Sequence, residues 1–569
     1  MRDVNAEPRR VLIIGLDAAA PDLLERWAAA GELPVLAGLM RAGTWAPLRS
    51  VPNMSSPAAW TTFMTGKNPG RHGIFFFTEQ IPGTYHNRYV NGSMRDGVPF
   101  WRVMDLEGRR VGVMNVPITY PAEPLNGFMI AGMDAPDAAA VGFAYPPTLV
   151  RDLEGTLGRF GDRGPISAAI GGEFLRGHYE AALQILLDRL ETRTRWAEHL
   201  LREYALDVFA IVHTETDGVA HFFWKFMDPR HPDHAPDLAR RYGDAILRVY
   251  RKADESVGRL IRAFGEDGLV VVLSDHGAGR ISWRADPRLL LRTFLIETGM
   301  LATVGSRRGR PMPWRRRAVR RLYEWFNPRF PASLKARLRS RVPGLAARLK
   351  RGGLRDATRW TQTRAYVTSA TAIYVNLRGR EPQGIVEPGR EYEEVRREII
   401  RQLSAAVDPL TGERIVLGAY TREAIYEGPH LDGAPDITLE LNPDAGVSGF
   451  QLGERRVLFP RLRPASPAEA MSGTHRPFGI LVLAGPGVAP GASLERPALQ
   501  DIAPTVLHVT ECAVPSDVDG RVLFEAFAGD LRARPVRRTS IGLDERTVQA
   551  FSDVEAEQVE ERLRALGYI

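Results

Sequence analysis

Short apolar runs, each followed by a helical pattern, constrain the fold of this 569-residue chain more than any other feature. The first run is Val11–Leu16, and the same alternation of strand and helix recurs at residues 111–116, 207–212 and 269–273. A strand that is apolar along its whole length is typical of a parallel sheet covered on both faces. The sequence therefore predicts an α/β protein with a layered core.

The predicted core is interrupted in the second half of the chain. Long helical patterns at residues 172–204 and 237–264 predict helices that flank the sheet. Core-like sequence then stops near residue 280 and resumes with an apolar strand at 479–484. We interpret residues 1–280 and 471–541 as the core, with an inserted cap of helices and strands between them, residues 281–470. A charged helical tail, residues 542–569, follows the core.

The cysteine content limits the kinds of site that the chain can build. Cys512 is the only cysteine, which excludes an internal disulfide framework and every multi-thiolate metal site. Any metal must therefore bind to Asp, Glu and His. The apolar runs are also far shorter than the roughly 18 residues that a membrane-spanning helix needs, and the run at Val11–Leu16 lacks a small-residue cleavage site. We expect a cytoplasmic protein.

The positive charge is concentrated in one segment of the predicted cap. Residues 306–351 contain 16 Lys and Arg against one acid, Glu324, together with several aromatic residues. Such a mixture could contact an anionic surface such as a membrane or a nucleic acid. The alternative is a solvated helical segment whose arginines pair with acids elsewhere, because no specific nucleic-acid motif accompanies it.

Two motifs near the start of the chain place polar side chains at the ends of predicted elements. Asp17 follows the first strand, where a ligand role competes with simple capping of the next turn. Pro57 suits the first position of a helix, which predicts Ser56 as the N-cap among free backbone N–H groups. That position favours an anion or a phosphorylated serine. A plain capping serine is the alternative, and Ser55 is the other hydroxyl in reach.

Three later motifs supply carboxylates and imidazoles. Asp217 and His221 are four residues apart, so on a helix they share one face and could bind one ion. Asp275 and His276 follow the strand at 269–273 and point in different directions, which suits ligands that close a site from two sides. His475 is expected in a loop before the strand at 479–484. Each motif alone also fits a surface pair or a polar loop, whereas together they could form two metal sites beside a serine.

The combined motifs resemble the alkaline phosphatase superfamily, and within it the type I phosphodiesterase/nucleotide pyrophosphatase branch. The resemblance spans nearly the whole chain. The residues that carry it are Gly15-Leu16-Asp17, the stretch 56–73 with Thr65-Gly66 and Pro69-Gly70-Arg71-His72-Gly73, Asp217 to His221, Ser274 to Gly277, Gly473-Thr474-His475 and Gly379-Arg380-Glu381-Pro382.

The resemblance implies a three-layer α/β/α core with an inserted α+β cap, and a metal-dependent hydrolase of phosphodiester or pyrophosphate bonds. It implies two divalent metal ions, zinc as in such phosphodiesterases or manganese as in related mutases. One ion would be bound by Asp17, Asp275, His276 and the nucleophile Ser56, and the other by Asp217, His221 and His475. The substrate would be a small phosphate ester or anhydride that forms a phosphoserine intermediate at Ser56.

One departure from the family pattern bears on the substrate. His72-Gly73-Ile74 is followed by three phenylalanines, residues 75–77, where nucleotide pyrophosphatases have a region with a phosphate-binding asparagine. Lys67 or Arg71 would then contact the phosphate instead. The aromatic run could line the site, or it could be buried core.

Alternatives to this function remain open from the sequence. A phosphomonoesterase or phosphomutase would use the same metal and serine chemistry. A sulfatase is disfavoured because Cys512 lies far from Ser56 and outside the required motif. A non-catalytic protein that binds anionic surfaces through residues 306–351 is the alternative outside the enzymes.

Overall fold

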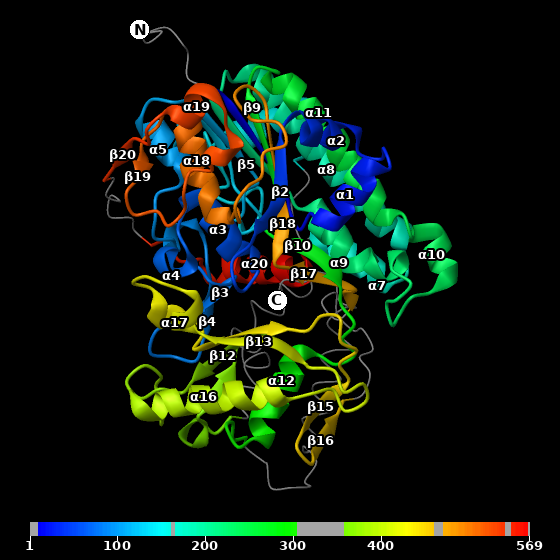
Figure 1. The fold of residues 1–569 in the computed structure, drawn as a ribbon, viewed down its shortest axis with the longest axis vertical. Coiled ribbons are helices and arrows are strands. Elements are labelled where there is room, and N and C mark those ends of the chain that lie inside the picture. Colours follow the sequence, from blue (N-terminus) through cyan, green and yellow to red (C-terminus); the bar gives the residue numbers. More distant parts are fainter. Residues whose placement is uncertain (1–8, 161–165, 304–357, 460–469, 541–547, 567–569) are drawn as a thin grey trace, which may run out of the picture.

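The computed structural model describes residues 9–160, 166–303, 358–459, 470–540 and 548–566, and the basic segment 306–351 lies outside them. At its centre is an eight-stranded sheet with the order β2-β18-β9-β1-β8-β5-β6-β7 (Figure 1). The strands are β1 (Val11–Leu16), β2 (Thr44–Arg49), β5 (Val111–Met114), β6 (Gly127–Ile130), β7 (Ala144–Tyr145), β8 (Val208–His213), β9 (Leu269–Leu273) and β18 (Phe478–Ala484). Strands β9, β1, β8, β5 and β6 are parallel, whereas β18, β2 and β7 join through antiparallel pairs. The structure confirms the predicted α/β fold class.

Alternate residues of the central strands fill two apolar clusters, one on each face of the sheet. In β1, Leu12 and Ile14 belong to one cluster, and Val11 and Ile13 belong to the other. The first cluster includes α1 (Pro21–Ala29), α2 (Pro34–Ala42), α8 (Tyr179–Glu203), α9 (Glu215–Met227) and α11 (Ala245–Phe264), and the second includes α3 (Ser56–Thr65), α5 (Phe100–Leu106) and α18 (Ile502–Val509). Because side chains alternate along a strand, this arrangement is a three-layer α/β/α core.

Each of the two long helical patterns forms two helices in the structure. Residues 172–204 fall in α7 (Ile166–Leu175) and α8, which are separated by Gly177 at φ 81°. Glycine adopts this left-handed conformation without steric cost, which makes it a common helix terminator. Residues 237–264 divide into α10 (Pro236–Tyr242) and α11, with the break at Gly243 and Asp244.

The chain between β9 and β18 forms a second sheet with its own apolar cluster. Its four antiparallel strands have the order β11-β12-β14-β13 and lie below the core in Figure 1. The elements are α12 (Pro287–Glu297), β11 (Ala365–Val367), β12 (Ala372–Val375), α16 (Arg390–Ala405), β13 (Val416–Thr421), α17 (Arg422–Ile425), β14 (Ile437–Leu441), β15 (Gly449–Leu452) and β16 (Arg455–Leu458). Leu291, Phe294, Ile373 and Ile399 are buried together in this cluster.

Two β-ribbons connect the core with the second sheet. β10 (Gly277–Arg280) and β17 (Gly473–Arg476) pair antiparallel where the chain leaves and re-enters the core. The hairpin of β3 (Thr78–Gln80) and β4 (Asn87–Tyr89) extends from the core, and its Tyr85 stacks on Trp360 with ring centroids 3.5 Å apart. The Tyr85 hydroxyl also donates to Asn376 Oδ1 at 2.7 Å. The carboxyl ends of the parallel strands thus face the second sheet.

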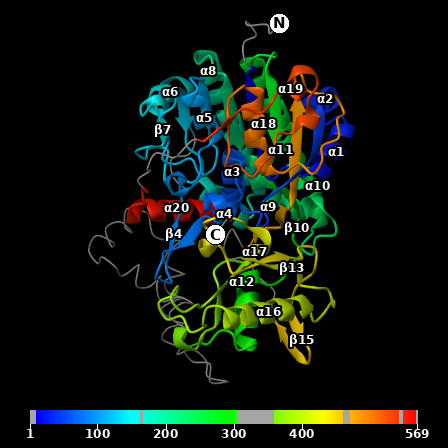
Figure 2. The same cartoon turned by 60° about the vertical axis from the view of Figure 1, so that its left-hand side comes forward.

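The C-terminal helix α20 (Asp553–Leu566) packs against the core, and Figure 2 shows it in red between the core and the second sheet. Val559 and Leu563 are buried against Phe77 and Met133. The smaller elements are α4 (Pro69–His72), α6 (Leu149–Leu157), α19 (Gly529–Ala533), β19 (Val514–Pro515) and β20 (Arg538–Thr539). Among the described residues, no helix combines the length and the apolar character needed to cross a membrane.

Candidate metal centre and nucleophile

Asp17 directly follows β1, at the sheet edge where open α/β folds bind their ligands. Its N–H donates to the carbonyl of His213 at 3.0 Å, and its carbonyl accepts from the Thr216 hydroxyl at 2.6 Å. The Trp60 indole donates to Asp17 Oδ2 at 3.3 Å. The buried Oδ1 accepts no hydrogen bond from the residues that the structure describes. Asp17 is therefore a fixed carboxylate with one oxygen open to a ligand.

Asp275 and His276 lie beside Asp17, in the turn after β9. Asp275 Oδ1 accepts from the N–H of Ala18 at 3.3 Å, and its Oδ2 lies 3.2 Å from His276 Nε2. Within the described part of the chain, Asp275 Oδ2 accepts no hydrogen bond. One ligand atom from each of Asp17, Asp275 and His276 lies within 4.8 Å of the other two. All three side chains are buried, so they form a compact group that could bind one ion.

Ser56 is the first residue of α3, which corrects its predicted position as the N-cap. The carbonyl of Ser55 accepts the first helical hydrogen bond, from Ala59 at 2.9 Å, so Ser55 is the N-cap and Pro57 occupies the second helical position. A proline fits either position because the first N–H groups of a helix have no helical partner. The Ser56 hydroxyl oxygen lies 3.2 Å from His276 Nε2 and is buried. The N-terminus of α3 and the Ser56 hydroxyl therefore face the group of Asp17, Asp275 and His276.

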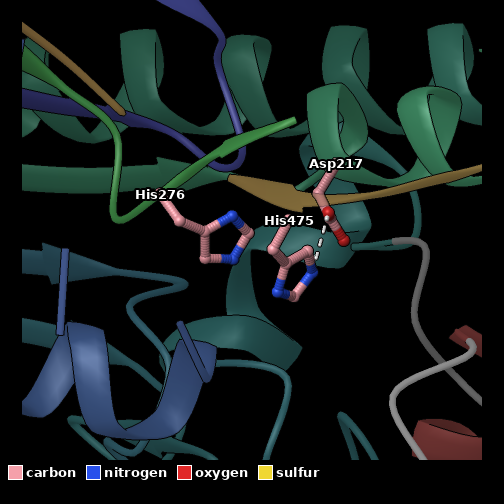
Figure 3. Close-up of side chains that lie close together, drawn as sticks. All are labelled: Asp217, His276 and His475. Atoms are coloured by element: carbon pink, nitrogen blue, oxygen red, sulfur yellow. Dashed lines mark ion pairs between the residues drawn. The ribbon is translucent and has the colours of Figure 1, made fainter. Parts of the chain in front are cut away.

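A second group lies next to the first. Asp217 and His221 are one turn apart on α9, with Asp217 Oδ1 3.1 Å from His221 Nε2. His475 Nε2 lies 3.6 Å from the same oxygen, and Figure 3 shows Asp217, His475 and His276 close together. Asp217, His276 and His475 each offer a ligand atom within 4.8 Å of the other two. His276 therefore belongs to both groups.

His475 lies in a strand, where the sequence predicted a loop. It is part of β17 and pairs with Ala278 of β10. This pairing joins residues almost 200 positions apart, so no local pattern in the sequence indicates it. The ribbon brings His475 against His276, and their rings stack with centroids 3.7 Å apart. Strand pairing, rather than loop closure, positions this ligand.

The three imidazoles are oriented by hydrogen bonds to backbone carbonyls. The Nδ1 atoms of His221, His276 and His475 lie 3.0, 3.1 and 2.8 Å from the carbonyl oxygens of Gly473, Gly277 and Met54. A carbonyl only accepts, so each Nδ1 carries a hydrogen and each Nε2 is turned toward the carboxylates. This is the arrangement that metal-binding histidines adopt in proteins.

Burial and mutual repulsion dominate the electrostatics of the carboxylates. Burial, with the charge of Asp275 next, raises the pKa of Asp17 well above its usual range. Burial also raises the pKa of Asp275. Burial alone would raise the pKa of Asp217, yet the imidazoles of His221 and His475 hold it well below its usual range. Burial lowers the pKa of His276, so its ring is neutral.

These residues fit divalent cations. Two buried carboxylate oxygens, Asp17 Oδ1 and Asp275 Oδ2, accept no hydrogen bond from the described residues, which is costly unless a cation compensates. Imidazole nitrogens and carboxylate oxygens are the ligands that zinc takes where thiolates are missing. The described residues bring together all seven predicted metal ligands, namely Asp17, Ser56, Asp217, His221, Asp275, His276 and His475.

Lys67 and Arg71, the basic side chains predicted to contact the substrate, are both paired with carboxylates. Lys67 Nζ lies 2.5 Å from Asp517, and Arg71 Nε lies 2.7 Å from Asp519. Substrate contact by either cation stays a prediction. Among the three phenylalanines, Phe75 packs against Tyr426 with ring centroids 5.1 Å apart, and Phe77 is buried under α20. These contacts agree with the buried-core interpretation of the aromatic run.

Sequence reasoning missed Trp60, which bonds to Asp17. Two features of the sequence agree with this hydrogen bond. Trp60 lies one helical turn after Ser56, and Gly15 stands two residues before Asp17. Neither feature names the partner, because the contact joins residues 43 positions apart.

One protein family and two solved structures resemble this chain. The model of the family "type I phosphodiesterase / nucleotide pyrophosphatase" matches residues 11–454. The crystal structure of phosphonoacetate hydrolase from Sinorhizobium meliloti 1021 with phosphonoformate has 15% identity, covers 89% of this chain and 96% of that chain, and has a TM-score of 0.51. Murine ectonucleotide pyrophosphatase/phosphodiesterase 5, an inactive variant with AMP, has 12% identity, the same coverage and a TM-score of 0.45. No curated protein matches the sequence. At 15% identity the likeness to phosphonoacetate hydrolase shows the fold alone.

Proposed function

The chain belongs to the type I phosphodiesterase/nucleotide pyrophosphatase family and is a phosphoric ester hydrolase, and we propose that it cleaves phosphodiester or pyrophosphate bonds through a phosphoserine at Ser56. Two divalent cations, zinc or alternatively manganese, complete the proposed site. In this proposal, the core (residues 1–280 and 471–541) carries the chemistry, and the cap (residues 281–470) selects the substrate.

One observation carries the proposal: the Ser56 hydroxyl contacts the residue that the two ligand groups share. Its oxygen lies 3.2 Å from His276 Nε2, and His276 belongs both with Asp17 and Asp275 and with Asp217 and His475. A nucleophile at this position lies between two sites for positive charge. Two-cation sites of this kind act on phosphoryl groups in in-line displacements.

The residues of the chain supply the covalent step and its surroundings. The Ser56 hydroxyl gives up its proton to solvent as its oxygen attacks phosphorus, an O–P bond forms, and the bond to the leaving oxygen breaks as that oxygen takes up a proton from solvent. A water then attacks the phosphoserine, which releases phosphate or a phosphate monoester and restores the hydroxyl. The N-terminus of α3 stabilises the negative charge of the phosphoserine, because the dipole of the helix is positive there and its N-cap residue, Ser55, makes no side-chain capping hydrogen bond.

Hydrogen bonds within the chain fix the metal ligands of the proposal. His221 and His475 are fixed through Nδ1, and Asp17 is fixed by its backbone and by Trp60. Divalent cations bound by these groups would lower the pKa of the serine hydroxyl and neutralise charge on the phosphoryl group. Their preorganised ligands need little rearrangement, which favours both binding and rate.

The test compares turnover of an aryl phosphodiester and an aryl phosphomonoester by the wild type, Ser56→Ala and Ser55→Ala, each loaded with zinc or manganese. Ser56→Ala is expected to lose on the order of a thousandfold or more in kcat, because an activated nucleophile is not replaced by its neighbours. Acid-quenched wild type is expected to carry phosphate on a peptide that contains Ser56. If Ser55→Ala loses this much kcat while Ser56→Ala keeps its activity, the nucleophile is Ser55 and not Ser56.

Two outcomes would favour the alternatives. A strong preference for the monoester would indicate a phosphomonoesterase or phosphomutase with the same serine chemistry. Turnover that is insensitive to a chelator, or no turnover with either ion, would contradict the proposal. Salt-sensitive binding to anionic vesicles in that case would support the surface-binding protein instead.

A further inference from the structure

Trp60 joins the nucleophile helix to a ligand of the candidate metal centre. It lies four residues after Ser56 on α3, so both side chains project from the same face of the helix. The indole is fully buried, and its Nε1–H donates to Asp17 Oδ2 at 3.3 Å. Asp17 Oδ1, which accepts no hydrogen bond within the described part of the chain, is left for the centre.

The sheet makes room for this indole with a glycine. A Cβ atom at Gly15 would lie 2.5 Å from Cη2 and 3.2 Å from Cζ3 of Trp60, closer than packed atoms approach. Gly15 stands on β1 two residues before Asp17. The ring therefore crosses the strand at Gly15, and a side chain there would displace it.

We propose that Trp60 is a positioning residue that fixes the rotamer of Asp17, so that Oδ1 faces the ion and the Ser56 hydroxyl. The inference rests on the proposed function, in which Asp17 binds a divalent cation. A partner that holds a metal-binding carboxylate typically changes metal affinity by about 10- to 100-fold when it is removed. Because Ser56 and Trp60 share α3, the same helix sets both the nucleophile and the carboxylate beside it.

A second buried tryptophan provides the control for simple packing. Trp101 is also fully buried and belongs to the same apolar cluster as Trp60. Its Nε1 has no hydrogen-bond partner among the described residues. Replacing either indole with a benzyl group removes a similar volume from the same core, and only the change at Trp60 removes a hydrogen bond to Asp17.

The experiment measures Zn²⁺ and Mn²⁺ affinity of the metal-depleted full chain by competition with a chromophoric chelator, for the wild type, Trp60→Phe and Trp101→Phe. Urea unfolding of the same metal-depleted proteins reports the packing loss. We expect both variants to lose stability, and only Trp60→Phe to bind metal at least about tenfold more weakly. Equal metal affinity of the two variants would overturn the inference.

Two further measurements keep the outcomes separate. If Trp60→Phe fails to fold, β-(3-benzothienyl)alanine at position 60 keeps the ring size and removes only the N–H donor, with the same residue at position 101 as its control. An unchanged affinity with the analogue at position 60 would also overturn the inference. Should the wild type bind neither ion, the proposed function fails, whereas wild-type binding with an unaffected Trp60→Phe removes only the role of Trp60.

Discussion

The Nε2 atoms of His221 and His475 lie 3.2 Å apart, although each ring donates its Nδ1 hydrogen to a backbone carbonyl. With both Nδ1 hydrogens committed to carbonyls, the two Nε2 atoms face each other, which is favourable only where a proton or a cation lies between them. The carboxylate of Asp217 is in reach of both rings, at 3.1 and 3.6 Å. A divalent cation would satisfy all three groups at once.

Metal loading is therefore expected to stabilise the folded protein. At a free Zn²⁺ concentration 100 times Kd, binding to the native state alone adds about 2.7 kcal/mol to the free energy of unfolding. His475→Ala is expected to lose a large part of this gain, whereas His178→Ala, at an exposed histidine paired with Glu173, keeps it. Thermal unfolding with chelator and with Zn²⁺ checks the prediction. An equal gain in both variants would contradict it.

A buried ion pair supports the start of α9, the helix that carries Asp217. Arg193 pairs with Glu215 and donates to the Thr214 hydroxyl at 3.0 Å, and both charged side chains are buried. Arg193→Met leaves a buried carboxylate with less compensation, so we expect a loss of about 3 kcal/mol in the free energy of unfolding.

The double variant Arg193→Met/Glu215→Gln is expected to recover part of that loss, because it removes the carboxylate as well. Arg390→Met, which breaks the exposed pair with Glu394, serves as the control and should cost less than about 1 kcal/mol. Urea unfolding of the three variants measures the differences. A double variant that is as unstable as Arg193→Met would rule out the carboxylate as the cause.

Gly15 is expected to tolerate no side chain while Trp60 is present. Gly15→Ala should destabilise the fold by about 1–3 kcal/mol through overpacking. In the Trp60→Phe background the cost should shrink, since the nearest atom, Trp60 Cη2 at 2.5 Å, is gone and only Val212 Cγ2 at 2.9 Å still crowds the added methyl. Gly38→Ala is the matched control, because a Cβ at Gly38 meets no atom within 4 Å. Additive costs of Gly15→Ala and Trp60→Phe in a double-mutant cycle would disprove the contact.

Asp134 gives the fold a defined pH dependence. Its buried carboxylate accepts from the N–H groups of Ile118 and Tyr120 at 2.8 and 2.9 Å, and burial raises its pKa to about 6. A raised pKa favours the protonated native state, so this contribution is complete below the unfolded pKa of 3.8 and is lost as the pH rises through about 6.

Asp134→Asn cannot ionise, so the stability difference between wild type and variant is expected to change with pH. Relative to the variant, the wild type should lose on the order of 3 kcal/mol as the pH rises from about 4 to about 7. Urea unfolding at several pH values in that interval tests this. A difference that stays constant with pH would mean that Asp134 keeps an ordinary pKa.

The strands were the most predictable part of the structure, because their apolar runs are local. Val11–Leu16 and Leu269–Leu273 were predicted with the bounds that the structure shows. The helix breaks after Leu175 and Tyr242 were missed, since helical periodicity continues across them. The strand position of His475 was missed because pairing with β10 depends on distant residues.

The candidate centre was predictable as a set of residues and not as a geometry. Asp217 and His221 share a helix, so their contact follows from spacing alone. The sharing of His276 by both groups depends on how the ends of β1 and β9 meet α9 and β17. The hydrogen bond from Trp60 to Asp17 depends on how α3 lies against β1. Such relations between elements arise only once the sheet has formed.

The β10–β17 ribbon has a consequence for the candidate metal centre. The chain leaves the core after Arg280 and re-enters it at Gly473, and these two residues pair with each other in the ribbon. His276 and His475 lie at the core end of this ribbon. The register of β10 and β17 is fixed by their own hydrogen bonds, so the length of the chain between the two strands does not set it. The spacing of the two histidines is therefore set by backbone pairing in the ribbon and not by the chain that the ribbon closes off.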